Sequence, residues 1–274
     1  MTIEASTRVR LDRPAIAVWR APGVLQVGID DPSVVLEGVP RALADAVPLL
    51  AHPCTTEELA TLLPRLDPEW LPWLVDRLGS AGLLATATPV VEPSILVVGA
   101  GPLAAAVAHA VAVGGRHVDR LDPVGFAALP SRPDAPELVL LATGTAEPDR
   151  ALTDALFREG RAHLVVRLEP DRAVVGPLVV PGSTPCVRCS DFVRGHLDPA
   201  WPHLLAQLCR EGVEPVPALR TWAASTAAVQ VHAWQAGAAA DASGASLELT
   251  LPDYRLRRRA WPAHPACGCL LTPG

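Results

Sequence analysis

The chain has 274 residues, half of them apolar, with 29 acidic and 23 basic residues and a net charge of -6. This length and apolar content exclude an intrinsically disordered chain and allow two folded domains. Every basic residue is arginine and none is lysine. The net negative charge argues against a general nucleic-acid-binding protein.

The apolar segments of the chain are too short to cross a bilayer. The most apolar helical candidate, residues 102–113, falls well short of the ~20 residues that a transmembrane helix needs. The first six residues contain Glu4 and lack the basic-then-apolar order of an export signal. We therefore predict a cytoplasmic protein without a membrane partner.

Residues 1–88 are predicted to form a small α+β unit with the order of elements of a winged helix. Three apolar-rich runs are separated by turn sequences, which indicates an antiparallel meander, and three helices and a short strand are expected to follow. The strands fall at residues 15–20, 24–29, 34–39 and 83–85, and the helices at residues 40–50, 55–64 and 67–79.

Local signals indicate where two of these helices begin. Thr55 and Glu58 have the spacing of a capping box, in which each side chain bonds the backbone N–H of the other residue. Asp67 and Pro68 suit the start of the third helix. Pro72 lies awkwardly early in that helix, which leaves a later start open.

This first unit is better suited to bind a peptide than DNA. Its third helix carries acidic residues and no lysine, so it lacks the row of basic side chains that would bind the phosphates of DNA. A short meander exposes an edge strand to which an extended peptide can add, beside a helix that supplies side-chain contacts. The residues predicted to contact the peptide are Val34, Val35, Leu36, Trp70, Leu74 and Arg77.

Residues 89–274 are predicted to form a Rossmann-type, doubly wound sheet after a linker that ends at residue 93. A buried strand at 94–98, the turn Gly99-Ala-Gly101 and a helix of small residues give the context of a dinucleotide-binding fingerprint. Asp122 ends the next strand, where an acidic residue would meet a ribose hydroxyl. We predict that Gly99, Gly101 and Asp122 contact a nucleotide; the alternative is a sheet that kept its glycines without a ligand.

The rest of this domain alternates strands and helices, which predicts a mostly parallel sheet with both faces covered. Strands are expected at residues 117–121, 137–142, 162–167, 173–180 and 247–251, and helices at residues 103–113, 151–160 and 218–236.

Two close-spaced cysteine pairs, Cys186 with Cys189 and Cys267 with Cys269, predict a zinc site. Each pair suits a tight turn, and four thiolates suit tetrahedral Zn²⁺. Because four protein ligands leave no open position, the predicted site is structural. Disulfides or unpaired buried thiols are the alternative, and His264 could replace one cysteine as a ligand.

Several short motifs follow one another along the chain. They are Val18-Trp-Arg20 with Leu25-Gln-Val-Gly28, Gly176-Pro-Leu-Val-Val-Pro-Gly182, Pro185-Cys-Val-Arg-Cys189, Asp198-Pro-Ala-Trp201 and Trp261-Pro-Ala-His-Pro-Ala-Cys-Gly-Cys269. Residues 94–270 resemble the E1-like adenylating enzymes of the ThiF/MoeB type. More closely, the whole chain resembles the E1-like, ocin-ThiF-like partner proteins of azole-forming cyclodehydratases.

That resemblance implies that this chain works together with a second protein, each with a separate role. The winged-helix unit would bind the leader of a ribosomally made precursor peptide, and a degenerate E1 domain, closed by structural zinc, would bind a YcaO-type ATP-dependent cyclodehydratase. The partner would then form thiazole or oxazole rings in the peptide. E1-like domains often dimerise through their sheets, so a homodimer is one alternative, and the sequence leaves the oligomeric state open.

The chain departs from active E1 enzymes at the phosphate site. It has no lysine, and the strand at 138–142 runs into Thr143-Gly-Thr145 where a metal-binding aspartate is expected. Losing charge stabilisation at a transferring phosphate slows a reaction by orders of magnitude. We therefore expect a non-catalytic protein without ATP as cofactor. An active E1-like adenylyltransferase acting on a peptide or carrier-protein carboxylate is the alternative, whereas a nicotinamide oxidoreductase is disfavoured because no hydride-transfer constellation follows Asp122.

Two further features have competing interpretations. Cys209 lies where an E1 thioester cysteine could fall, but the leucines around it favour a helix-buried thiol. The arginines at 257–259 could grip an acidic partner surface, although a solvated charged turn is the commoner case.

Overall fold

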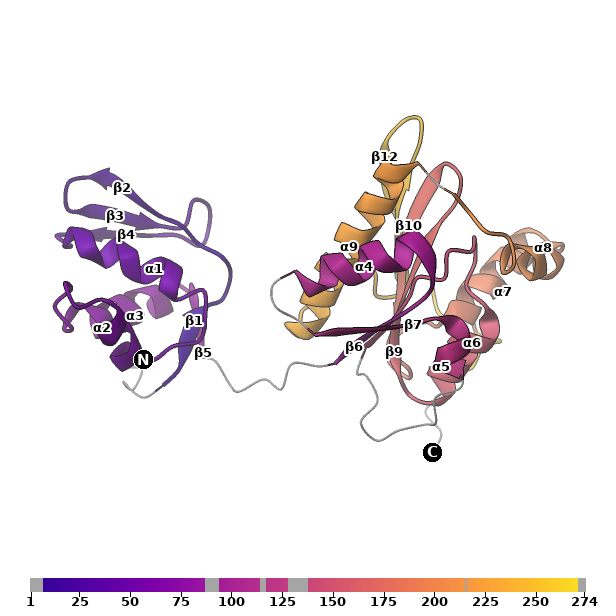
Figure 1. Ribbon diagram of the computed structural model, residues 1–274, viewed down its shortest axis with the longest axis horizontal. Coiled ribbons are helices and arrows are strands. Elements are labelled where there is room, and N and C mark those ends of the chain that lie inside the picture. Colours follow the sequence, from indigo (N-terminus) through magenta and orange to yellow (C-terminus); the bar gives the residue numbers. More distant parts are fainter. Residues whose placement is uncertain (1–6, 87–93, 114–116, 128–137, 215, 271–274) are drawn as a thin grey trace. The chain divides into compact units, whose positions relative to one another are not determined.

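The computed structural model describes residues 7–86, 94–113, 117–127, 138–214 and 216–270 (Figure 1). The chain divides into two compact units, Met1–Val91 and Glu92–Gly274. The domain boundary predicted after residue 88 and most of the predicted linker lie outside the described residues.

The first unit contains an antiparallel sheet and a separate strand pair. β3 (Val24–Val27) lies between β2 (Ala17–Ala21) and β4 (Val34–Glu37), as the meander predicted. β1 (Val9–Leu11), which was not predicted, pairs with β5 (Leu84–Thr86). Within the described residues no strand pairs with the outer edge of β2 or of β4.

Of the helices of the first unit, the one with the capping box begins as predicted, whereas the third begins later than Asp67 and Pro68 indicated. The helices are the 3-10 helix η1 (Arg41–Asp45), α1 (Ala46–Leu49), α2 (Thr56–Leu62) and α3 (Trp70–Ser80). Thr55 Oγ1 accepts from the Glu58 N–H at 3.1 Å, and Glu58 Oε2 accepts from the Thr55 N–H at 2.9 Å. The predicted capping box is therefore present. α3 begins after Asp67, whose carboxylate accepts from the Glu69 N–H at 3.0 Å, so the later start is the correct one.

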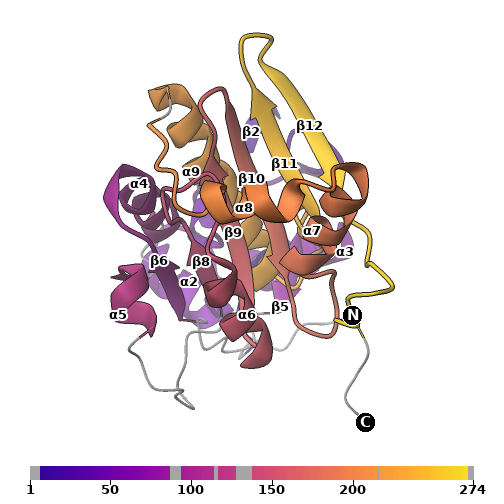
Figure 2. The ribbon, with the colours of Figure 1, turned by 90° about the vertical axis from the view of Figure 1, so that its right-hand side faces the viewer.

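The second unit is built on one seven-stranded sheet in the order β12-β11-β10-β9-β8-β6-β7 (Figures 1 and 2). Its strands are β6 (Ile95–Val98), β7 (Val118–Leu121), β8 (Leu138–Leu141), β9 (Ala162–Leu168), β10 (Arg172–Val179), β11 (Ala245–Thr250) and β12 (Arg255–Ala260). Its helices are α4 (Gly101–Ala112), α5 (Pro123–Ala127), α6 (Arg150–Arg158), α7 (Val187–Leu197), α8 (Trp201–Leu208) and α9 (Pro217–Gln235).

The sheet is mixed, which corrects the expectation of a mostly parallel one. β7, β6, β8 and β9 run parallel, but β10, β11 and β12 each pair antiparallel to their neighbours. Only residues 169–171 join β9 to β10, and a parallel connection needs a dozen or more residues. The arginines at 257–259 belong to β12, so the expectation of a charged turn there is wrong.

Helices cover both faces of the sheet, so its central strands are apolar on both sides. Ile95 and Val97 of β6 belong to the core cluster that contains α4 and α9, while Leu96 and Val98 belong to the cluster that contains α5, α6 and α7. Figure 2 shows these helices around the sheet. The second cluster also contains three buried cysteines, Cys186, Cys189 and Cys269. No helix among the described residues is long and apolar enough to cross a bilayer.

Candidate metal centre and peptide-binding edge

The four paired cysteines converge on one point of the second unit. Cys186 caps the amino terminus of α7 and Cys189 lies in its first turn, while Cys267 and Cys269 lie in the closing turn of the described chain. The Sγ atoms of Cys186 and Cys267 are 3.4 Å apart, and those of Cys189 and Cys269 are 3.3 Å apart. All four sulfurs lie within 4.8 Å of one another.

This geometry suits a metal ion rather than disulfides. All six cysteines are free, and sulfurs of a disulfide would lie about 2.05 Å apart. Tetrahedral zinc with Zn–S bonds of about 2.3 Å separates its sulfurs by about 3.8 Å. Burial raises the pKa of the Cys189 thiol to about 11. A cation at the centre would offset the cost of burying thiolates, so the donor set fits an ion such as zinc.

His264 lies beside the cysteine cluster without joining it. Its backbone N–H donates to Cys189 Sγ at 3.3 Å. Its imidazole stacks on Phe192, with ring centroids 4.9 Å apart and an interplanar angle of 14°. Its Nδ1 accepts from the Ala266 N–H at 3.2 Å. These contacts support four sulfur ligands, with His264 orienting one of them through its backbone.

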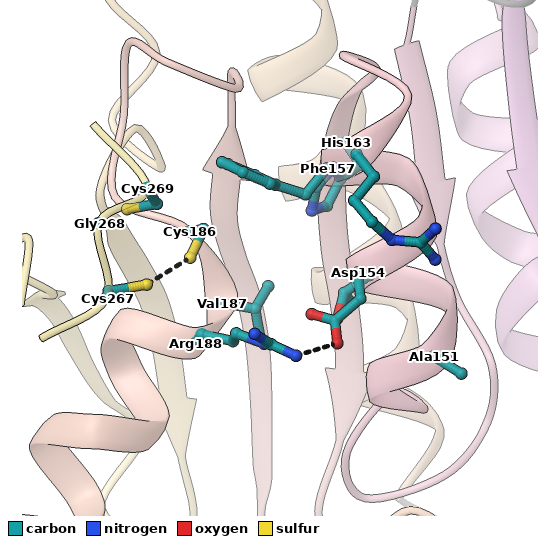
Figure 3. Close-up of a pocket in the computed structure, with 12 residues that line it drawn as sticks. Ala151, Asp154, Phe157, His163, Cys186, Val187, Arg188, Cys267, Gly268 and Cys269 are labelled. Atoms are coloured by element: carbon teal, nitrogen blue, oxygen red, sulfur yellow. Dashed lines mark hydrogen bonds and ion pairs between the residues drawn. The ribbon is translucent and has the colours of Figure 1, made fainter. Parts of the chain in front are cut away.

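A pocket of ≈ 310 Å³ opens beside the cluster (Figure 3). Cys186 and Cys267 line it together with residues of α6, and Arg188 forms an ion pair with Asp154 at 2.6 Å. Four sulfur ligands leave a metal ion no open position for a molecule in this pocket. The arrangement therefore fits a structural centre.

Two of the three residues predicted to contact a nucleotide, Gly99 and Asp122, have a structural contact of their own. A Cβ on Gly99 would lie 1.9 Å from the Ala142 carbonyl oxygen, so the close approach of β6 and β8 requires glycine there. Gly101 has φ +78° at the start of α4 and open space around it. The Asp122 carboxylate accepts from the Gly125 N–H at 2.6 Å in α5. Gly99 and Asp122 therefore have a packing reason that does not depend on a ligand.

A buried charge network lies at the carboxyl ends of β8 and β9, and the sequence reasoning did not identify it. Glu147, 4% exposed, accepts from Arg150 at 2.9 Å and also bonds Arg194, and Arg167 lies 3.4 Å away. Arg150 in turn donates twice to Asp191, at 2.7 and 2.8 Å. We call these five residues the Glu147 network.

The Glu147 network shifts the ionisation of its members. Burial pushes the pKa of Glu147 upward, but the guanidinium groups of Arg167, Arg194 and Arg150 outweigh it and lower that pKa to about 2. Arg194 also lies between two indole rings, 4.5 Å from Trp201 and 4.9 Å from Trp261. The network therefore ties α7 and α8 to the sheet, and its arginines are already paired.

Cys209 follows α8 and is half-buried. Its thiol donates to the Pro148 carbonyl oxygen at 3.3 Å. Burial raises its pKa, the opposite of what a reactive thiolate requires. This environment favours the packed thiol over the thioester nucleophile.

The residues predicted to bind a peptide are split between surface and core. Leu36 and Leu74 are 2% and 0% exposed and belong to the core of the first unit, so neither can present a side chain to a peptide in this conformation. Val35 is 40% exposed. On α3, Trp70 and Trp73 make an edge-to-face pair with centroids 5.3 Å apart, and the Arg77 guanidinium lies 5.6 Å from the Trp73 ring.

The backbone of Val35 points away from the sheet. The Gly28 N–H donates to the Ile16 carbonyl oxygen, so the backbone groups of Gly28 point toward β2. Successive residues of an antiparallel strand direct their backbone groups to opposite sides, so Leu25 and Val27 hydrogen-bond β4. Their partners on β4 are Leu36 and Val34. The N–H and C=O of Val35 therefore face the free edge, where an added strand would bond them.

No protein-family model matches the sequence, and no curated protein matches it. Solved structures do match. A heterocyclase in complex with substrate and cofactor superposes with a TM-score of 0.65 at 16% identity, over 97% of this chain and 40% of that chain. The heterocyclase TruD gives 0.61 at 16% identity, over 96% and 43%.

A third structure, E. coli MccB with ATP, gives a TM-score of 0.53 at 10% identity, over 96% of this chain and 99% of that chain. At these identities the likeness establishes the fold alone. The resemblance expected from the sequence is thus confirmed for the fold, in both heterocyclase and MccB structures. The chain spans about two fifths of the length of the two heterocyclases.

Proposed function

We propose that this chain binds the leader of a ribosomally made precursor peptide and presents it to a YcaO-type ATP-dependent cyclodehydratase. The observation that carries the proposal is the fold likeness over 97% of the chain to a heterocyclase solved with its substrate. Both units take part in that likeness. The chain would contribute to ring formation by proximity, because a bound leader raises the effective concentration of the residues to be modified near the partner's active site.

The free edge of β4 is the proposed leader site. An extended leader would bond the outward N–H and C=O of Val35, which gives affinity without requiring a particular sequence. The partly buried indoles of Trp70 and Trp73 on α3 offer apolar contacts for leader side chains. The proposed peptide contacts are therefore Val35 and the exposed part of α3. Leu36 and Leu74 pack in the core beneath them and do not contact the peptide.

The second unit is proposed to be a scaffold closed by zinc at Cys186, Cys189, Cys267 and Cys269. Zinc would supply a fixed tetrahedral centre there and no reaction step. Arg150 and Arg167, which lie near the carboxyl ends of the parallel strands, are paired with carboxylates of the same chain. Paired arginines are poor ligands for a triphosphate, which supports a non-catalytic role. Whether two copies of this chain form a homodimer stays untested.

We expect Val35→Pro to weaken leader binding at least about tenfold, the effect of losing roughly 1.4 kcal/mol of edge hydrogen bonding. Proline there removes an outward N–H and leaves the β3–β4 bonds in place. The measurement is fluorescence anisotropy with the labelled leader of a Cys/Ser/Thr-rich precursor peptide from the same genome. Its matched control is Ala17→Pro, which removes an outward N–H from β2 at the opposite edge of the same sheet.

Two results would count against the leader site. One is no detectable binding by the wild-type chain up to hundreds of micromolar leader, which rejects the receptor role. The other is equal affinity of the Val35→Pro and Ala17→Pro chains, which rejects β4 as the site. Circular dichroism of both variants shows whether the first unit remains folded.

An active adenylyltransferase is the second candidate function, and the likeness to MccB bound to ATP favours it. Under the leading proposal, titration of Mg-ATP into the chain in a calorimeter gives no heat of binding up to millimolar ATP. Pyrophosphate exchange dependent on the peptide is likewise absent. Tight Mg-ATP binding together with exchange by the isolated chain would replace the scaffold proposal with the enzymatic one.

A further inference from the structure

The outermost strand of the large sheet, β12, is uncovered on both faces. Of its six residues only Arg259 is partly covered. Leu256 is 67% exposed and Tyr254, just before the strand, is 74% exposed. Within the described residues no strand pairs with its outer edge. Figure 2 shows β12 at one end of the sheet, beyond β11 and β10.

β12 concentrates positive charge in an acidic chain. The β11–β12 hairpin holds four arginines against two carboxylates, Glu248 and Asp253, although the whole chain carries a net charge of -6. Glu248 is buried and lies 3.5 Å from Arg172. Within the described residues, Arg255 and Arg257 form no ion pair and no side-chain hydrogen bond. Their charges are therefore available to a partner.

The other two arginines of β12 are held in place. Arg258 Nε donates to the Asp241 carbonyl oxygen at 2.9 Å. The Arg259 guanidinium stacks 4.3 Å from the Trp261 ring, and that indole donates to Ser246 at 3.0 Å. These contacts stiffen one end of the strand. A stiff strand loses less conformational entropy when a partner pairs with it.

The outer edge of β12 also offers backbone groups. The Trp261 N–H donates to Gly244, so Arg259, Arg257 and Arg255 direct their backbone groups toward β11. The N–H and C=O groups of Leu256, Arg258 and Ala260 consequently face outward. An extended segment can pair with them as an eighth strand.

The side chains specify the chemistry of that segment. Arg255 and Arg257 share one face of the strand and Leu256 lies on the other, because successive side chains alternate. A complementary strand would carry acidic residues at every second position toward the arginines and apolar residues at the positions between them. Self-pairing of two β12 strands would instead set arginine against arginine, which disfavours a second copy of this chain.

Charged residues on an edge strand also prevent aggregation, and that role alone would explain arginines. It does not explain why Leu256 and Tyr254 are exposed beside them. We propose that β12 is the docking strand for an acidic, alternating segment of the cyclodehydratase partner. This inference rests on the proposed function. The solved heterocyclases contain a further part beyond the region matched here, since this chain covers 40% and 43% of them.

The test uses the full chain and a YcaO-type cyclodehydratase from the same genome, with binding measured by biolayer interferometry. We expect the double variant Arg255→Glu and Arg257→Glu to bind at least about tenfold more weakly, and wild-type binding to weaken as salt is raised. Arg258→Pro, which removes an outward N–H, should weaken binding while Arg258→Ala changes it less. The matched control is Arg120→Glu, a charge reversal on the exposed face of β7 at the opposite end of the sheet.

The outcomes separate this inference from the proposed function. If the wild-type chain binds neither leader nor enzyme, the proposed function fails. If it binds both, and the β12 variants bind the enzyme as tightly as Arg120→Glu does, only the docking strand is rejected. Leader affinity must stay unchanged in the β12 variants. If β12 instead captures a single-stranded oligonucleotide and the enzyme does not compete, the surface is for nucleic acid and the docking proposal is wrong.

Discussion

Replacing Cys189 with serine is expected to remove the metal from the chain and to destabilise the second unit by several kcal/mol. Cys189 is 0% exposed and lies in the first turn of α7, within a core layer of the sheet, so a lost metal also frees the start of that helix. Structural zinc contributes about 10–16 kcal/mol to small zinc peptides, which have no other core. This unit has a large core of its own, so we expect a smaller but still major loss.

Two measurements check this result. Elemental analysis should find one zinc ion per wild-type chain and almost none in Cys189→Ser, and thermal unfolding should shift to a markedly lower midpoint. Cys209→Ser is the matched control, since its thiol lies outside the cluster and its one side-chain hydrogen bond among the described residues goes to a backbone carbonyl. A wild-type chain that folds fully without any bound metal would contradict the structural role of the four cysteines.

Replacing Glu147 with glutamine is expected to cost about 3–5 kcal/mol of folding stability, the usual effect of removing one partner from a buried ion pair. Arg150 keeps Asp191 and Arg167 keeps Glu169. Arg194 loses the only carboxylate that it contacts among the described residues. The measurement is denaturant unfolding followed by tryptophan fluorescence. Asp154→Asn is the control, because its partner Arg188 has a side chain that is 61% exposed and the pair should contribute less than about 1 kcal/mol.

The same carboxylate predicts a pH dependence. Its pKa is lowered from 4.5 to about 2 in the folded chain, so it contributes about 3 kcal/mol that is fully present above pH 4.5. That contribution should be lost as the pH falls from 4.5 through about 2. The Glu147→Gln chain should lose less stability than the wild type over this range. Parallel acid unfolding curves for the two chains would show that Glu147 is not the group responsible.

Local sequence patterns were sufficient to predict most of the helices and strands. The capping box at Thr55 and the buried strand before Gly99 depend on neighbours within a few residues, and both are present. The two cysteine pairs could also be predicted from the sequence, because the two ligands of each pair are brought together by a tight turn of a few residues. What the sequence could not supply was the distance between the pairs, which depends on α7 and the closing turn meeting at the end of the sheet.

Errors arose where a side chain's role depends on what covers it. Leu74 was predicted to contact a peptide, but Leu74 and Leu78, four residues apart in α3, both face the core, so Leu74 cannot line a groove. The role of Glu147 could not be predicted for the same reason, because it depends on which residues cover its carboxylate. Nothing in its local sequence indicates that arginines from α6, α7 and β9 surround it.

The sequence by itself determined that the chain mixes helices and strands, the four candidate metal ligands and the absence of lysine from any phosphate site, since these follow from composition, periodicity and close spacing. Only the tertiary structure decided that the sheet is mixed, that Val35 and β12 present free backbone edges, and that Arg150, Arg167 and Arg194 are neutralised inside the protein. Edges and ion pairs depend on which strands and helices become neighbours, and that choice is made by burial across the whole chain rather than by adjacent residues.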